Sequence, residues 1–202
     1  MTYAALLLAA GASHRMGRCK TTLPWGDRPS LLTYQTEQMH QAGLIPIVVL
    51  GSHNAHRQVD CAPNTQIVIN PHPEQGKVSS ILSGLAHLPT DVTALVLCAI
   101  DQPRPADLYV ALLNAYKRHA APIVAPIYQG KLGHPLLFSA TLLPHLHQIR
   151  DETLGLRAVV QQVYDQIHRV EWPSALVHDD FNTPKAYTQA HATLLSTYRG
   201  DG

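Results

Sequence analysis

Hydrophobic residues along this chain gather in short, unbroken apolar runs, and amphipathic stretches separate the runs. An extended segment that is apolar on both faces is typical of a strand buried inside a parallel sheet. The runs predict strands at residues 3–9, 45–51, 66–70, 93–100 and 122–128. Two later runs predict a strand of different orientation at 136–140 and a last strand at 166–172.

Apolar residues recur at helical spacing between these runs. They predict helices at residues 29–42, 53–59, 79–88, 106–119, 141–150, 154–163 and 183–195. Gly43 closes the first of these helices, and Ser79 begins the third as an N-cap. Because strands alternate with helices, we expect a single Rossmann-like α/β domain over residues 1–202, with a mainly parallel central sheet and helices on both faces.

Composition narrows the classes of function. Fifteen Lys and Arg residues balance 14 Asp and Glu residues, so the chain lacks the basic excess of a nucleic-acid-binding protein. The longest early apolar run, "AALLLAA", is too short to span a membrane and has no charged lead-in of a signal peptide. Three scattered cysteines without C-x-x-C spacing predict free thiols, and we expect a cytoplasmic protein.

The unusual residues of the chain concentrate in four loops. In open parallel sheets, ligands bind beyond the carboxyl ends of the strands. The loops that follow the first, third, fourth and fifth predicted strands are "AAGASHRMGRCK", "NPHPEQGKVSS", "DQP" and "YQGKLGHP". The sequence therefore predicts a binding site that these loops share.

The first loop has the ingredients of a phosphate site. It fits neither the Walker A pattern nor the dinucleotide fingerprint, because its glycines and lysine have the wrong spacing. Gly11 and Gly17 let the backbone bend toward a ligand, and its N–H groups can then bind anionic oxygens. Arg15 and Lys20 can neutralise phosphates. Spacing alone leaves a second interpretation open, in which this is an ordinary glycine-rich turn with solvated basic residues.

Two segments carry a family resemblance. "LLLAAGASHRMGRCKTTLP" resembles the L-A-A-G-x-S-x-R-M-G-x-x-K-x-L-L-P signature of the MobA-like nucleotidyltransferases, with Thr22 as a departure. Its "LAAG" resembles the cytidylyl-transferring members, whereas guanylyl-transferring members usually have "LAGG". "NPHPEQGKVSSILSGL" resembles a second family segment, from which Lys77 and Val78 depart. The resemblance implies a fold of the nucleotide-diphospho-sugar transferase type. It also implies nucleotide contacts by Leu8, Ala9, Ala10, Gly11, Ser13, Gly17, Gly76, Ser79, Ser80 and Gly84.

Three further segments extend the resemblance. Asp101 in "AIDQP" resembles the family's magnesium ligand, although a lone Asp after a strand is also a common helix cap. "GKLGHP" resembles the segment near the acceptor pocket, which implies acceptor contacts by Gly133, His134 and Pro135. "HDDFNTPKAY" resembles a late metal-binding segment. Asp180 matches its first acidic residue and Asn182 replaces the second, or Asn182 or Thr183 caps a helix there.

The resemblance implies a magnesium-dependent nucleotidyltransferase. Arg15, Lys20 and Asp101 would be its catalytic residues, and Asp101, Asn182 and Asp180 its metal contacts. CTP would donate CMP to a phosphorylated acceptor such as molybdopterin, pyrophosphate would leave, and a molybdenum enzyme would be a partner. Three alternatives stay open: another nucleotide or acceptor, a nucleotide-binding accessory protein for molybdenum-enzyme maturation, and an oxidoreductase on the same scaffold.

Overall fold

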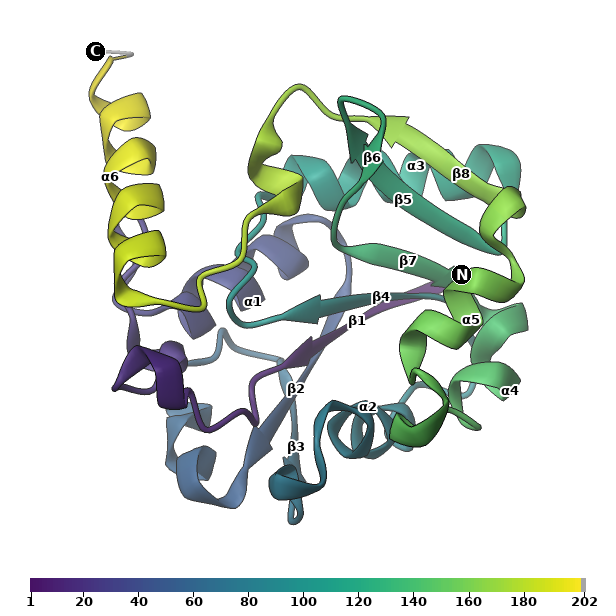
Figure 1. Cartoon of the computed structure of the whole chain (residues 1–202), viewed down its shortest axis with the longest axis horizontal. Coiled ribbons are helices and arrows are strands. Elements are labelled where there is room, and N and C mark those ends of the chain that lie inside the picture. The colour runs from purple at the N-terminus through teal and green to yellow at the C-terminus, as the bar shows by residue number, and fades with distance from the viewer. Residues whose placement is uncertain (201–202) are drawn as a thin grey trace.

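A computed structural model of the chain describes the backbone of residues 1–200 and the side chains of residues 1–13 and 15–194. Eight strands form one sheet in the order β3-β2-β1-β4-β7-β5-β6, with β8 paired to β5 (Figure 1). The strands are β1 (Thr2–Leu8), β2 (Ile45–Gly51), β3 (Gln66–Asn70), β4 (Val92–Ala99), β5 (Ile123–Tyr128), β6 (Lys131–Leu132), β7 (Leu136–Ser139) and β8 (Ile167–Glu171). The α-helices are α1 (Leu31–Gln41), α2 (Lys77–Leu85), α3 (Ala106–His119), α4 (Leu143–Leu146), α5 (Leu156–Gln162) and α6 (Pro184–Gly200).

The centre of the sheet is buried on both sides. In β1, Ala5 and Leu7 face one core cluster, whereas Ala4 and Leu6 face the other. Apolar side chains of α1 and α3 complete the first cluster, and those of α2, α4 and α5 complete the second. Helices therefore cover both faces, and the predicted α/β architecture is confirmed.

β7 interrupts the parallel order of the sheet. It lies between β4 and β5 and runs antiparallel to both, with Ala94 opposite Ser139 and Ile123 opposite Phe138. The strand of different orientation expected at 136–140 is thus confirmed. The β1–β2, β1–β4, β2–β3 and β5–β8 pairs are parallel, so the carboxyl ends of β1, β3 and β4 meet at one edge.

Some predicted helices were wrong in their bounds. α2 begins at Lys77 and not at Ser79, because Gly76, with φ at +94°, turns the chain into the helix. The stretch 141–150 holds only the four-residue helix α4 after a short 3₁₀ turn, and 53–59 is 3₁₀ rather than α. Among the described helices, none is long and apolar enough to cross a bilayer.

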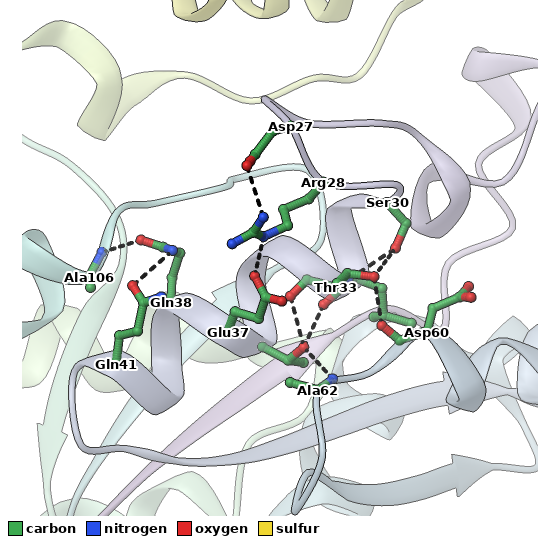
Figure 2. A network of polar contacts seen from close by, with 12 residues as sticks. Asp27, Arg28, Ser30, Thr33, Glu37, Gln38, Gln41, Asp60, Ala62 and Ala106 are labelled. Carbon is green, nitrogen blue, oxygen red and sulfur yellow. Dashed lines mark hydrogen bonds and ion pairs between the residues drawn. The ribbon is translucent and has the colours of Figure 1, made fainter. Parts of the chain in front are cut away.

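Polar contacts fix α1 to its neighbours (Figure 2). The Ser30 hydroxyl accepts a hydrogen bond from the Thr33 N–H at 3.0 Å and so caps α1, and the Thr33 hydroxyl donates to the Asp60 carbonyl at 2.8 Å. Further along, the Gln38 side chain accepts from the Ala106 N–H at 2.8 Å, which satisfies the first turn of α3. These contacts hold α1 and α3 on one face of the sheet, behind the edge where the loops meet.

Candidate active site

A cleft of about 510 Å³ opens at the carboxyl ends of β1, β3 and β4. It lies where three of the four predicted loops converge, as the topology of the sheet requires. Its lining includes eleven of the predicted site residues: Leu8, Ala10, Gly11, Ser13, Arg15, Lys20, Gly76, Ser80, Asp101, Asp180 and Asn182. Residues that the sequence did not single out as contacts also line it: Met16, Pro73, Lys77, Ala99, Ile100 and Gln102.

A basic and an acidic side chain meet at the centre of this cleft. The Lys20 Nζ lies 2.7 Å from the Asp101 Oδ2 and donates to the Asn182 Oδ1 at 3.0 Å. The Arg15 guanidinium donates to the same Asn182 oxygen at 3.2 Å. Three segments that are far apart in the sequence therefore bring their polar groups to one point.

Backbone hydrogen bonds explain how these segments come together. The Ile100 N–H donates to the Leu8 carbonyl at 3.0 Å, which extends the β1–β4 pairing up to Asp101. The Phe181 N–H donates to the Asp101 carbonyl at 3.0 Å. Phe181 is buried against Trp25, with the ring centroids 4.9 Å apart. Burial of this aromatic side chain places Asn182, its neighbour in the chain, over the cleft.

The loop after β1 is held by a serine and an asparagine. Ser13 has φ at +55°, and its hydroxyl accepts a hydrogen bond from the Lys20 N–H at 3.3 Å. The buried Asn54 accepts from the Gly51 N–H at 2.8 Å and donates to the Ala9 carbonyl at 2.9 Å. The loop is therefore anchored on both sides before Lys20 reaches the cleft.

The N-terminus of α2 forms the wall of the cleft beyond β3. The N-cap residue of α2, Gly76, has no side chain to bond the first-turn N–H groups, which leaves them open on that side, and the Asp151 carboxylate lies next to Gly76. Ser80 lines the cleft, and the buried Asn70 side chain donates to its hydroxyl at 3.1 Å. Asn70 also donates to the Ser79 hydroxyl at 2.7 Å.

Four residues predicted to contact the nucleotide do not line the cleft. Ala9 is part of the sheet, since its N–H donates to the Val49 carbonyl. The Ser79 hydroxyl is engaged by Asn70 and donates to the His72 carbonyl. A Cβ on Gly84 would lie 2.2 Å from the Leu6 Cδ1, so this glycine lets α2 pack closely on β1. Gly17, the fourth, is exposed outside the cleft with φ at +66°.

A second cavity, of about 680 Å³, lies beside the first. It contains Gly133 and His134 of the predicted acceptor loop, whereas Pro135 is buried outside its lining. Much of the lining is apolar and comes from α2, α5 and the loop before α5. Lys77 lines both cavities, so the two hollows adjoin at the first residue of α2.

The imidazole of His134 is neutral at physiological pH. Desolvation, followed by the positive charges of Arg104 and Lys77, lowers the pKa of His134 from 6.5 to about 4. A neutral ring can exchange hydrogen bonds but carries no charge to attract a phosphate. Lys77 and Arg157 also line the second cavity and can carry positive charge there.

The oxygen donors in the cleft fit a hard divalent cation. Asp101, Asp180 and Asn182 all line it and offer carboxylate and amide oxygens, which Mg²⁺ and Mn²⁺ accept. Within the described residues, no group of three or more His, Cys, Asp or Glu side chains could hold a metal by itself. Such an ion would therefore depend on oxygens of the substrate as well.

Three buried polar residues hold the loops around the site, and the sequence analysis did not single them out. Asn54, Asn70 and Arg104 are at most 2% exposed, and each bonds to backbone or side-chain groups of the loops around the site. A polar residue at the end of a predicted strand is a signal that could have found Asn70. Asp151, Gly155 and Arg157, which the sequence did not single out, line the second cavity.

Comparison with known proteins decides the family. Residues 5–169 match the MobA-like NTP transferase domain. The chain belongs to this family. The resemblance seen in the sequence is thereby confirmed, and with it the expectation that the chain is a nucleotidyltransferase.

Two members of the family resemble this chain in sequence. The molybdenum cofactor guanylyltransferase of Xanthomonas euvesicatoria pv. vesicatoria (strain 85-10) is 32% identical over 114 residues, which are 56% of this chain and 54% of that protein. This match thus spans about half the length of that relative. The molybdenum cofactor cytidylyltransferase of Escherichia coli (strain K12) is 26% identical over 188 residues, which are 92% of this chain and 93% of that protein.

Solved structures share the fold. Rv0371c from Mycobacterium tuberculosis H37Rv has a TM-score of 0.79 at 25% identity, covering 95% of this chain and 100% of that one. Its manganese complex has a TM-score of 0.75 at 23% identity, covering 95% and 98% of the two chains. The CTP complex of CMP:2-keto-3-deoxy-manno-octonic acid synthetase has a TM-score of 0.76 at 11% identity, covering 98% and 100%. The expected fold of the nucleotide-diphospho-sugar transferase type is confirmed.

Proposed function

We propose that this protein transfers CMP from CTP to the phosphate of molybdopterin, with Mg²⁺, and releases pyrophosphate. The single observation that carries the proposal is the meeting of Lys20, Arg15, Asp101 and Asn182 in one cleft. Cations that can bind phosphate oxygens face oxygen donors that can hold a metal, which is the pairing that a nucleotidyl transfer uses.

The cleft provides separate sites for the parts of a nucleotide. Arg15 and Lys20 neutralise the triphosphate from the loop after β1. The open N–H groups of α2 and the hydroxyl of Ser80 can bind polar edges of the base or ribose. For transfer to an acceptor in the second cavity, the α-phosphorus of the triphosphate would have to lie where the two cavities adjoin, at Lys77.

Lys77 is the side chain best placed to serve both substrates. It lines the nucleotide cleft and the second cavity. An acceptor in the second cavity would therefore bring its phosphate to Lys77, beside the α-phosphorus. In-line attack needs this alignment and no general base, because the attacking oxygen is already an ionised phosphate.

The choice of CTP depends on the "LAAG" sequence at residues 8–11, the form typical of cytidylyl-transferring members. The cytidylyltransferase match supports it, because it extends over 92% of the chain, whereas the guanylyltransferase match extends over 56%. The acceptor is assigned as molybdopterin because both relatives are named for the molybdenum cofactor. Such a product would pass to a molybdenum enzyme, which we assign as the partner.

Mg²⁺ is assigned to the oxygens of Asp101, with Asp180 and Asn182. When bound, the ion would stabilise the negative charge that develops on the phosphates. The residues of the chain have their own tasks: Asp101 would hold the ion, and Lys20 and Arg15 would hold the phosphates. The Asn182 amide oxygen accepts from both of these cations, so it would exchange them for the ion.

Pyrophosphate release tests this function directly. The purified protein is incubated with CTP, GTP, ATP or UTP, each with Mg²⁺ and with or without molybdopterin. We expect release that requires molybdopterin and is fastest with CTP. Faster release with GTP would overturn the base assignment, and turnover with another phosphorylated acceptor only would overturn the acceptor.

One observation favours a second candidate, a nucleotide-binding accessory protein for molybdenum enzymes. Asn182 stands where the family segment has a carboxylate, which weakens the charge available for a metal. The two candidates differ in the same assay. An accessory protein would show a CTP-dependent rise in melting temperature without pyrophosphate release for any acceptor.

A further inference from the structure

Arg104 is a buried cation whose hydrogen bonds, within the described part of the chain, go to backbone carbonyls and to no carboxylate. The residue is 1% exposed, and its guanidinium donates three hydrogen bonds. Nε donates to the His134 carbonyl at 3.1 Å, Nη1 to the Pro103 carbonyl at 3.1 Å and Nη2 to the Asp179 carbonyl at 2.9 Å. Burial lowers the pKa of this arginine, and the charges of Asp179 and Asp101 raise it in part.

The three carbonyls belong to three segments that form the site. Pro103 lies two residues after Asp101, and Asp179 immediately precedes Asp180. His134 belongs to the loop that lines the second cavity. One guanidinium therefore joins the two segments that carry the candidate metal contacts to the loop that faces the acceptor.

Neighbouring backbone bonds make these segments dependent on one another. The His134 N–H donates to the Val177 carbonyl at 2.7 Å, and the Phe181 N–H donates to the Asp101 carbonyl at 3.0 Å. The Arg104 bonds lie between these two contacts. Without them, three carbonyls would lose their donor, one in a buried bond and two in partly buried bonds, and the segments would separate more readily.

A residue that served packing alone would rarely be an arginine. Desolvating a guanidinium is costly, and an apolar side chain of similar size often stabilises a protein at least as well. What an apolar side chain cannot do is bond three carbonyls in a fixed planar fork. The form of the contact thus indicates a requirement for position rather than for stability alone.

We propose that Arg104 is a positioning residue that holds the metal-side segments 101–103 and 179–182 in register with the acceptor loop 133–135. The inference rests on the proposed function for its catalytic meaning, because register matters only if both substrates meet at this point. Its structural part, the coupling of the three segments by one side chain, can be tested without any substrate.

The test compares Arg104→Gln, Arg104→Lys and the control Leu112→Ala in the full chain. Leu112 is fully buried on α3 and has no polar group, so its truncation lowers the melting temperature without removing a hydrogen bond. Hydrogen exchange is measured at the amides of His134 and Phe181, and at Ala9 as an internal reference next to β1. Exchange is compared at temperatures that lie the same number of degrees below the melting temperature of each variant. Under these conditions we expect exchange at His134 and Phe181 to be at least about tenfold faster in both Arg104 variants than in Leu112→Ala, and exchange at Ala9 to be the same in all of them.

The lysine variant separates charge from geometry. It keeps the positive charge but cannot donate along three fixed directions, so we expect it not to restore slow exchange. If Arg104→Gln does not fold, Arg104→Lys alone decides the question. Equal exchange in the lysine variant and the wild-type chain would overturn the positioning role, as would faster exchange at His134 and Phe181 in Leu112→Ala to the same extent.

Two functional readouts connect the coupling to the site. The dissociation constant of Mn²⁺ in the absence of substrates, and the KM for molybdopterin in the pyrophosphate assay, should each rise by about tenfold in Arg104→Lys and stay unchanged in Leu112→Ala. A rise in one without the other would contradict a shared register. If the wild-type chain releases no pyrophosphate, the proposed function fails, whereas the exchange and Mn²⁺ results still decide the role of Arg104.

Discussion

Lys20 and Asp101 are 81 positions apart in the chain, yet the Lys20 Nζ lies 2.7 Å from the Asp101 Oδ2. Both side chains are mostly buried, with 11% and 17% of their surfaces exposed. The pair marks the point where the loop after β1 meets the loop after β4. In the proposed complex, Lys20 binds the phosphates and Asp101 binds the metal ion. The contact between Lys20 and Asp101 must therefore break when the two ligands bind.

Loss of the lysine charge tests the phosphate half of the site. Lys20→Met should lower the rate of pyrophosphate release about a hundredfold or more, because one charge partner of the transition state is removed. The variant should still unfold cooperatively on heating. Lys117→Met, which changes an exposed lysine on α3, is the matched control and should keep the wild-type rate. Near-normal turnover in Lys20→Met would exclude Lys20 from the mechanism.

A carboxylate at position 182 tests the metal half. Asn182→Asp adds a negative charge next to Asp101, so we expect Mn²⁺ to bind on the order of tenfold more tightly. The dissociation constant can be measured by electron paramagnetic resonance of the free ion. Asn64→Asp is the control, because Asn64 is exposed and has φ at +63°, which aspartate also tolerates. An unchanged affinity in Asn182→Asp would mean that this side chain does not face the metal.

A substitution of Lys77, which lines both cavities, tests whether the two substrates meet at this side chain. Lys77→Met should raise the KM for the acceptor by about tenfold, the effect of losing one charged contact. The rise in melting temperature caused by CTP should remain as in the wild-type chain if Arg15 and Lys20 carry the triphosphate. An effect on CTP binding with no effect on the acceptor would place Lys77 in the nucleotide site only.

The pH dependence tests the state of His134. Its pKa is lowered to about 4 by desolvation and by the charges of Arg104 and Lys77, so the folded chain binds fewer protons at this ring than the unfolded chain between that value and 6.5. Its contribution to stability is therefore complete above the unfolded pKa and is lost as the pH falls toward 4. Acceptor KM should show no transition that depends on His134 between roughly pH 6 and 8.

A variant separates this prediction from other titrations. On acidification, the melting temperature of His134→Gln should fall by less than that of the wild-type chain. The acceptor KM of this variant should stay independent of pH between roughly pH 6 and 8. His87→Gln, at an exposed position, should leave the fall unchanged. A KM that rises above pH 6.5 in the wild-type chain, and not in His134→Gln, would show that the charged ring binds the acceptor.

The strands could be predicted closely because each is defined by local pattern. The runs that form β1, β2, β4 and β5 are largely apolar on both faces, which is typical of strands buried in a parallel sheet, whereas β3 lies at the edge and is only partly buried. The different orientation expected for residues 136–140 is found in β7, which is antiparallel to β4 and β5. The two-residue strand β6 has no pattern of its own, since only its pairing with β5 defines it.

The helices whose bounds were predicted wrongly are those whose ends depend on proline or glycine positions and on contacts with distant residues. The stretch 141–150 has helical periodicity, but only Leu143–Leu146 is α-helical, with Pro144 in its first turn. α2 starts two residues before Ser79 because Gly76 turns the chain into the helix, and the Ser79 hydroxyl bonds to Asn70 and His72 instead of capping the helix.

The position of the site could be predicted from the sequence, but the buried residues that hold its loops could not. Lys20 and Asp101 each follow an apolar run, so the rule that ligands bind beyond the carboxyl ends of strands is enough to place both in one cleft. Asn54 and Arg104 were missed because their partners are backbone carbonyls 45 and 75 positions away, and no spacing in the sequence encodes such a contact.

A crystal structure of the chain with CTP and Mn²⁺ tests the central claim most directly. The account predicts the triphosphate between the Lys20 ammonium and an ion on the Asp101 carboxylate, with the contact between these two side chains broken and the base against α2. A triphosphate bound elsewhere, while Lys20 and Asp101 remain paired, would contradict it.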